Sequence, residues 1–221
     1  MESDYSDEQS VFVDLIKPGE NMVQNGDFSL GKALWIWTTT GSATAAWIIT
    51  NGTSLIDITN AGTQLAAVQL RQAGLRLRQG SEYALEFDAW SVLPRAIEVR
   101  LGQDQTPFTT YKVISPSLTT SPQHFTYFFT MTSVSDLNAR LMFNVGASTR
   151  DVYLDNVSIW MVAPGDFDRD RCVNDDDLKV LTDQWLQQGS GLSADLNGDG
   201  VVDFQDFAIF GENWSGGNCP W

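Results

Sequence analysis

The sequence predicts a mainly β protein: an antiparallel β-sandwich of the jelly-roll type, followed by a small α-helical module. Two features of the chain lead to this fold class. Between residues 20 and 163, short segments of alternating apolar and polar residues are separated by Gly, Pro and Asn, which is typical of strands with one buried face. Between residues 164 and 221, apolar residues recur instead at helical spacing.

The first segment, residues 1–19, is expected to be an acidic, disordered tail or linker. It is rich in Asp, Glu and Ser and ends at Pro18-Gly19, a composition that buries too little apolar surface to fold. No secretory signal is recognisable, because residues 1–9 are acidic and polar and the apolar stretch 11–16 is too short for one.

The net charge of −15 is concentrated in this segment and in the C-terminal module. Residues 166–221 contain 12 acidic and 3 basic residues, whereas residues 21–165 contain 10 and 9. The acidic regions would repel a phosphate backbone, so nucleic acid is not an expected partner. No apolar run approaches the ~20 residues that cross a bilayer, so no membrane span is expected.

The alternating segments place polar side chains on one strand face. Alternation is clearest at residues 68–71, 83–88, 97–101 and 141–145, and further strands are expected near 47–49, 54–58, 124–131 and 152–160. The outward polar residues are Gln69, Arg71, Glu98, Arg100 and Asn144. Aromatic residues that could lie beside them are Trp35, Trp37, Trp90, Phe108 and Tyr111. Aromatic rings beside hydrogen-bonding side chains suit sugars, which have apolar C–H faces edged by hydroxyls. The alternative is that the rings fill the core or a sheet edge.

Several stretches of the sandwich, taken in order, resemble carbohydrate-binding modules of families 4, 9 and 22. They are Asn-Met-Val-Gln-Asn-Gly-Asp-Phe at 21–28, the stretch 75–89 ending in Tyr-x-Leu-x-Phe-Asp-Ala, Phe-Asn-Val-Gly at 143–146 and Val-Tyr-Leu-Asp-Asn-Val at 152–157. The resemblance covers about residues 21–162. It implies a non-catalytic module that binds a polysaccharide in a groove on one sheet face.

The same resemblance implies particular side chains in that groove. It places groove residues at Phe108 and Asn144, and a second groove aromatic at Trp35 or Trp37. Trp37 is the expected one, because Trp35 matches a tryptophan that relatives bury. The expected ligand-binding residues are therefore Trp37, Gln69, Arg71, Glu98, Arg100, Phe108, Tyr111 and Asn144.

Relatives of this type also hold a structural calcium that joins the first and last strands. Asp155 matches the acidic ligand of that calcium, and Asp27 is a second expected ligand. The alternative for Asp27 is a turn residue that follows Asn25-Gly26.

The C-terminal module contains two twelve-residue segments with oxygen-bearing side chains at positions 1, 3, 5, 9 and 12. They are Asp166, Asp168, Asp170, Asn174 and Asp177 in the first segment, and Asp195, Asn197, Asp199, Asp203 and Asp206 in the second. An EF-hand loop binds calcium from these positions and from the backbone carbonyl of position 7, here Cys172 and Val201. Gly200 provides the turn at position 6 of the second loop, where the first loop has Arg171. A solvated acidic surface and a calcium sensor are the alternatives.

The two segments begin 29 residues apart, and an apolar stripe repeats with them. The stripes are Leu178, Leu181 and Trp185, then Phe207, Phe210 and Trp214. Each loop is therefore expected to precede one helix. No full helix fits before each loop, and position 12 is Asp rather than Glu. This combination resembles a type I dockerin, a duplicated loop–helix module with two EF-hand-like calcium loops.

The dockerin resemblance implies Ca²⁺ as cofactor and a cohesin-type protein domain as partner. It places partner-binding residues at loop positions 10 and 11: Asp175, Asp176, Phe204 and Gln205. The copies differ there, so a near-symmetric binding mode is not expected. Millimolar calcium is an extracellular condition, so we expect an extracellular or cell-surface location. There Cys172 and Cys219 can form a disulfide; two free thiols are the alternative.

No catalytic constellation stands out. His124 is the only histidine, so no His-rich metal site is expected, and we interpret it as a strand residue rather than as the base of a catalytic triad. Glu98 and Asp104 could lie near the groove as a glycosidase pair, but groove carboxylates more often bind sugar hydroxyls. We therefore expect no enzyme on this chain. We expect it to act in plant or algal polysaccharide degradation of the cellulosome type, as an accessory or C-terminal part of a glycoside hydrolase. The alternative is a structural or adhesive cell-surface protein whose sandwich mediates protein contacts.

Overall fold

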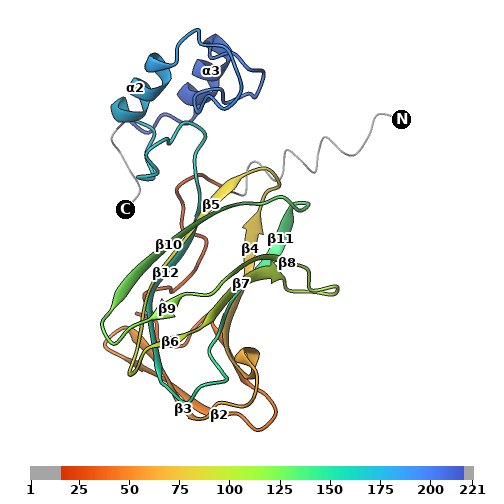
Figure 1. The fold of residues 1–221 in the computed structure, drawn as a ribbon, viewed down its shortest axis with the longest axis vertical. Helices are drawn as coiled ribbons and strands as arrows, with labels where there is room; N and C mark the ends of the chain where they lie inside the picture. Colours follow the sequence, from red (N-terminus) through yellow and green to blue (C-terminus); the bar gives the residue numbers. More distant parts are fainter. Residues whose placement is uncertain (1–15, 217–221) are drawn as a thin grey trace. The chain divides into compact units, whose positions relative to one another are not determined.

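A computed structural model describes residues 16–216 (Figure 1). Most of the predicted tail 1–19 lies outside these residues, and so does Cys219. The described residues form two compact units: residues 21–159 make up one, and residues 160–216 make up the other together with residues 16–20. No helix in the described part of the chain is long and apolar enough to cross a membrane.

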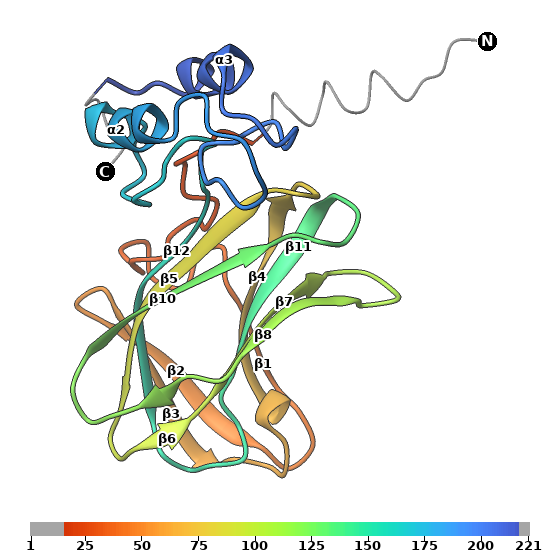
Figure 2. The same cartoon turned by 45° about the horizontal axis from the view of Figure 1, so that its top comes forward.

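The first unit is built from two five-stranded sheets, A and B, whose strands are labelled in Figure 2. Sheet A has the order β1 (Ile36–Thr39), β4 (Val68–Leu77), β11 (Asp136–Asn144), β7 (Glu98–Gln103), β8 (Thr110–Ile114). Sheet B has the order β10 (Gln123–Thr130), β5 (Glu82–Ser91), β12 (Val152–Met161), β3 (Thr53–Asn60), β2 (Thr44–Thr50). Two short strands, β6 (Arg95–Ala96) and β9 (Ser117–Leu118), pair with each other, and the 3-10 helix η1 (Leu65–Ala67) precedes β4.

Strand pairing in both sheets is antiparallel. Successive residues of a strand point to opposite faces, so Leu70 and Phe143 of sheet A and Phe87 of sheet B are buried between the sheets. The rings of Phe87 and Phe143 meet edge to face, with centroids 5.3 Å apart. Burial of apolar surface contributes about 25 cal/mol per Å², so the apolar half of each strand holds the sheets together. The predicted mainly β, antiparallel sandwich is confirmed.

A buried arginine fixes the connection between β11 and β12. Arg95 is 8% exposed, and its guanidinium donates to the carbonyls of Val145 at 2.6 Å, Gly146 at 2.9 Å and Arg150 at 2.7 Å. Burial lowers the pKa of Arg95 to about 10, which still leaves it charged at neutral pH. Gly146 is required in this connection, because a Cβ there would lie 2.3 Å from the carbonyl oxygen of Gln64.

The second unit contains two short helices, each directly preceded by one of the acidic segments. They are α2 (Asp175–Asp183) and α3 (Phe204–Glu212). Both begin with a capping box, formed by Asn174 with Asp177 in α2 and by Asp203 with Asp206 in α3. Capping satisfies backbone N–H groups that the first helical turn leaves without partners.

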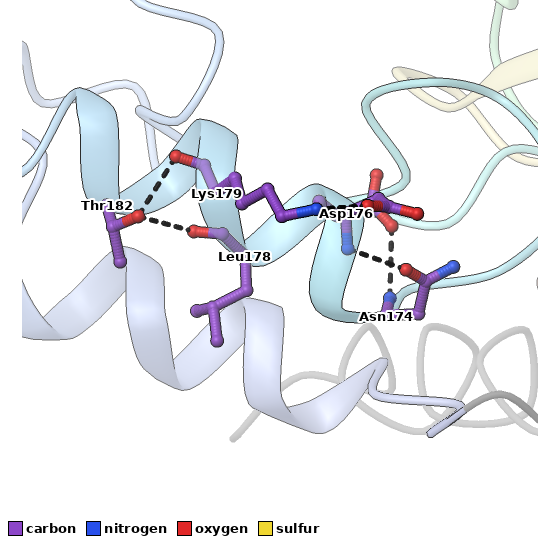
Figure 3. A network of polar contacts seen from close by, with 6 residues as sticks. Asn174, Asp176, Leu178, Lys179 and Thr182 are labelled. Atoms are coloured by element: carbon purple, nitrogen blue, oxygen red, sulfur yellow. Dashed lines mark hydrogen bonds and ion pairs between the residues drawn. The ribbon is translucent and has the colours of Figure 1, made fainter.

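Polar contacts continue along α2, as Figure 3 shows. The Asn174 side chain accepts from the Asp176 backbone at 2.7 Å. Lys179 pairs with the Asp176 carboxylate, and the Thr182 hydroxyl donates to the carbonyl of Leu178 at 3.0 Å. These contacts lie on the solvent side of the helix, since Asp176, Lys179 and Thr182 are exposed.

The opposite side of each helix contributes to a small core. Its fully buried members are Val173, Leu181, Ala194, Val202 and Phe210. Leu181 and Phe210 are the central residues of the two predicted stripes, and Leu178 and Trp185 of the first stripe pack against the same core. The outer members Phe207 and Trp214 remain 45% and 42% exposed, which leaves apolar surface on this unit.

Candidate functional site

Two rows of side chains cross the outer face of sheet A. The strand register brings Thr38, Gln69, Asn144 and Glu98 into one row. It brings Ile36, Arg71, Met142, Arg100 and Val113 into the next. Arg140 points to the same side, two residues before Met142 on β11. We call this surface the outer face of sheet A.

The first row forms a continuous chain of hydrogen bonds between planar groups. Gln69 Nε2 donates to Asn144 Oδ1 at 2.7 Å, and Asn144 Nδ2 donates to Glu98 Oε1 at 2.7 Å. Arg100 Nε donates to the same Glu98 oxygen at 3.2 Å. Asn144 is only 2% exposed, so its neighbours determine the orientation of its amide. The face therefore presents fixed donors and acceptors rather than freely rotating ones.

A second group of side chains surrounds Asp104, which follows β7. Arg71 donates to Asp104 Oδ1 at 2.8 Å, and Arg140 lies 3.5 Å from the same oxygen. The guanidinium of Arg140 lies under the Phe108 ring, 5.0 Å from its centroid. Phe108 is 52% exposed, so it offers an aromatic surface next to polar groups.

Tyr111 extends this group towards the start of β11. Its hydroxyl donates to the Asp136 carboxylate at 2.8 Å. Burial raises the pKa of Tyr111 well above its usual value, and the Asp136 carboxylate raises it further. The phenol therefore stays neutral and keeps its proton for hydrogen bonding.

Every predicted ligand-binding residue except Trp37 belongs to these two groups. Trp37 pairs with the buried Leu70 in the β1–β4 register, which places it on the inner face of sheet A, and its ring lies 6.2 Å from that of Trp47. Trp35 is buried as well. The predicted orientation of Trp37 is thus corrected: residues two apart in a strand point to the same side, so alternation could not separate the two tryptophans.

The sequence analysis did not identify Met142 and Arg140 as residues of this face, and it did not predict that Asp104 pairs with arginines. Met142 and Arg140 lie at even spacing from Asn144 on the same strand, so alternation alone could have identified them. The role of Asp104 depends on a contact with Arg71, 33 positions earlier in the chain, which no local pattern reveals.

Asp27 and Asp155, the predicted sandwich calcium ligands, lie near each other. Burial raises the pKa of Asp155, and the nearby carboxylates of Asp88 and Asp27 raise it further. The backbone and hydroxyl of Ser29 donate to Asp27, which lowers its pKa. Close by, the Val157 N–H donates to the Gly26 carbonyl at 3.0 Å and joins the two ends of the sandwich. Two carboxylates at this junction are compatible with a cation.

The first acidic loop brings Asp166, Asp168 and Asp177 together, with one carboxylate oxygen of each within 4.8 Å of the others. Asp166 and Asp177 are buried. Burial raises the pKa of Asp166 to about 7, and the carboxylates of Asp177 and Asp170 add to this shift. The donor set is the one that a hard cation such as calcium prefers, and the residues fit such an ion.

The second loop repeats the hydrogen bonds of the first with an offset of 29 residues. The first-position aspartates, Asp166 and Asp195, both accept from the backbone five residues later, at 3.1 and 2.9 Å. The last-position aspartates, Asp177 and Asp206, both accept from the backbone ten residues earlier, at 2.7 and 2.8 Å. The two loops thus share one fold.

This shared fold includes position 6 of each loop. Gly200 has φ 89° and Arg171 has φ 75°. Both values lie in the left-handed region, which is strained for a residue other than glycine. Arg171, which departs from the EF-hand pattern, therefore adopts the glycine-like backbone despite its side chain.

The other predicted calcium ligands occupy corresponding positions in the two loops. They are Asp170, Cys172 and Asn174 in the first loop, and Asn197, Asp199, Val201 and Asp203 in the second. Cys172 is buried and is not a free thiol. Cys219 lies outside the described residues, so the predicted Cys172–Cys219 disulfide stays a prediction.

The predicted partner-binding residues lie at the first turns of the two helices. Asp175 and Asp176 begin α2, and Phe204 and Gln205 begin α3. Phe204 is 77% exposed and meets the Trp185 ring edge to face at 5.1 Å. It borders an apolar hollow of about 330 Å³ that is lined by Leu178, Leu181, Thr182, Trp185, Phe204 and Phe207.

The fold and the outer face of sheet A define a β-sandwich binding domain. Residues 20–151 match the family described as carbohydrate binding domain, CBM_4_9. The chain belongs to this family, whose domains bind carbohydrate and are not catalytic.

Solved structures agree with this assignment. One titled "CBM4 structure and function" is similar over 63% of this chain and 99% of its own, with 25% identity and a TM-score of 0.58. The second N-terminal cellulose-binding domain of Cellulomonas fimi β-1,4-glucanase C is similar over 67% of this chain and 98% of its own, with 18% identity and a TM-score of 0.55. The latter likeness concerns the fold alone. No match was found among curated proteins.

Proposed function

We propose that this chain binds a polysaccharide on the outer face of sheet A and docks, with calcium bound, onto a cohesin-type protein domain. The observation that carries the first part is the fixed row Gln69–Asn144–Glu98–Arg100 beside the exposed ring of Phe108. A sugar chain on this face would stack a pyranose ring on Phe108 and exchange hydrogen bonds with the row.

The carboxylates on this face support binding rather than acid–base chemistry. Glu98 accepts from Asn144 and Arg100, and Asp104 accepts from Arg71. Both carboxylates are thus engaged by side-chain donors of the same face, whereas a glycosidase needs two carboxyl groups that face each other across the scissile bond. Their role on this face is to orient donors and to accept from sugar hydroxyls.

The test is retention on a panel of neutral and acidic polysaccharides in calcium. We expect retention on at least one polymer, and Phe108→Ala should weaken it about tenfold, since a stacked ring is worth on the order of 1.5 kcal/mol. Trp90→Ala is the matched control, because Trp90 lies in sheet B and stacks on Tyr153. Retention on no polymer would contradict the proposal and favour a structural or adhesive surface protein.

Calcium would be held by the two acidic loops. The ligands would be the oxygens of Asp166, Asp168, Asp170, Asn174 and Asp177 with the Cys172 carbonyl, and those of Asp195, Asn197, Asp199, Asp203 and Asp206 with the Val201 carbonyl. A bound Ca²⁺ supplies the positive charge that these clustered carboxylates lack. A third calcium would be held by Asp27 and Asp155 in the sandwich.

Calorimetric titration of calcium into the metal-free chain tests this assignment. We expect two tight sites from the loops, and Asp206→Ala should abolish one of them while leaving the other. Two unchanged sites in this variant would refute the role of Asp206. Heat from no site at all would refute the calcium assignment for both loops.

The docking role rests on the duplicated loop–helix unit and its exposed apolar hollow beside Phe204. An apolar side chain of a cohesin-type domain would fill this hollow, next to the polar residues Asp175, Asp176 and Gln205. Co-purification with type I cohesins, with and without a chelator, tests the role. We expect binding that needs calcium and falls in Phe204→Ala. Such a chain would work outside the cell, as the non-catalytic part or accessory of a glycoside hydrolase that degrades plant or algal polysaccharide.

A further inference from the structure

The two sheets of the sandwich carry opposite charge. The five strands of sheet A contain five basic residues and two acidic ones, a balance of +3: Arg71, Arg76, Arg100, Lys112 and Arg140 against Glu98 and Asp136. The five strands of sheet B contain no Lys or Arg and five acidic residues, a balance of −5 with His124 neutral: Asp57, Glu82, Glu86, Asp88 and Asp155. In a chain of net charge −15, sheet A is a local exception.

The positive charge of sheet A is concentrated on its outer face. Arg71 and Arg140 share a single oxygen of Asp104, at 2.8 and 3.5 Å. Arg100 has Glu98 as its partner at 3.0 Å, and its side chain is 39% exposed. Three guanidinium groups thus share these two carboxylates, whereas Asp136, the third carboxylate of this group, accepts from the Tyr111 hydroxyl.

One donor in this group lacks an acceptor. Arg140 Nε is buried and has no hydrogen-bond partner, which is unusual for a charged donor. The register sets Arg71 and Arg100 on either side of Met142 in one row, so their Cα atoms are two strand spacings apart, roughly 9.5 Å. An apolar floor with a guanidinium at each side suits a sugar ring that carries a negative group.

We propose that the outer face of sheet A takes an anionic polysaccharide, one whose sugars carry uronate carboxylates or sulfate esters. This inference rests on the proposed function and adds the ligand class. A guanidinium binds such oxyanions through two parallel hydrogen bonds, and Arg100 is the most exposed of the three. The acidic strands of sheet B repel the same ligand, so binding is confined to sheet A.

The test compares each acidic polymer with its own carboxyl-reduced form. Glucuronoxylan, polygalacturonate and alginate are used before and after reduction of their uronates to neutral sugars, together with a sulfated galactan. Affinity electrophoresis of the full chain in calcium should show at least one acidic polymer binding roughly tenfold more tightly than its reduced form. Binding to the sulfated polymer alone would identify sulfate as the source of the charge.

Two substitutions that each remove one positive charge test whether the preference for the acidic polymer depends on sheet A. Arg100→Gln should weaken binding of the acidic polymer about tenfold more than binding of the reduced polymer. Lys179→Gln removes one positive charge from the exposed side of α2 (Figure 3) and should change neither. Thermal melting of each variant checks that it is folded.

Equal binding of the acidic and reduced polymers, or an equal effect of Arg100→Gln on both, would overturn this inference. The proposed function would survive that outcome if Phe108→Ala still weakened binding. Retention of no polymer, neutral or acidic, would overturn both.

Discussion

The amide of Asn144 tests the polar row on sheet A, because Asp has almost the same shape and a different charge. Asn144 is 2% exposed, and its Nδ2 donates to Glu98 Oε1 at 2.7 Å. Asn144→Asp replaces this donor with a second carboxylate. Two charges about 4 Å apart repel by about 4 kcal/mol at an effective dielectric constant of 20, and the neighbouring Arg100 offsets part of this. We expect the free energy of unfolding to fall by about 2–4 kcal/mol at neutral pH.

Urea unfolding of the full chain in calcium, followed by tryptophan fluorescence, measures this change. Asn60→Asp is the matched control: the Asn60 side chain accepts from Gly62 N at 3.1 Å, which a carboxylate can also do. A loss below about 0.5 kcal/mol in Asn144→Asp would refute the hydrogen bond to Glu98.

Three further outcomes are expected. Arg95→Met should lower the free energy of unfolding by about 3–5 kcal/mol, because it leaves buried carbonyls without donors. Arg150→Met, which replaces an exposed arginine, should lower it by under about 1 kcal/mol. Urea denaturation measures both changes. Trp37→Ala should lower the melting temperature, because the contact with Trp47 is lost, but should leave the dissociation constant for polysaccharide nearly unchanged. An affinity loss as large as that of Phe108→Ala would contradict the inward orientation of Trp37. Gly200→Ala, at φ 89°, should lower the free energy of unfolding of the second unit by about 1–2 kcal/mol. Unfolding by increasing concentrations of a calcium chelator measures this change. An unchanged unfolding midpoint would show that the turn tolerates a side chain.

The part of the fold that the sequence predicts is the part that local periodicity determines. Alternation along β4, β7 and β11 identified Gln69, Arg100 and Asn144 as outward residues, because side-chain direction in a strand has a period of two residues. The outward direction expected for Trp37 came from the family resemblance and was wrong, because its direction depends on where β1 pairs with β4. Pairing register is a long-range property that one short strand does not reveal.

Other participants were missed because their partners are distant in the chain. Arg95 donates to carbonyls about 50 positions away, and Arg71 pairs with Asp104 across 33 positions. A single sequence carries no sign of such pairs. The acidic loops differ, because all their donors and acceptors lie within a dozen residues, and the 29-residue repeat in the sequence reappears in their hydrogen bonds.

The central claim is that polysaccharide binds the outer face of sheet A, and mapping by nuclear magnetic resonance tests it most directly. The ¹⁵N-labelled chain in calcium is titrated with an oligosaccharide of the polymer that it retains. We expect the largest shifts in the side-chain amides of Gln69 and Asn144 and in the Nε–H of Arg100. Shifts confined to Trp90 and Tyr153, the stacked pair of sheet B, would contradict the claim and place the binding surface on the opposite sheet.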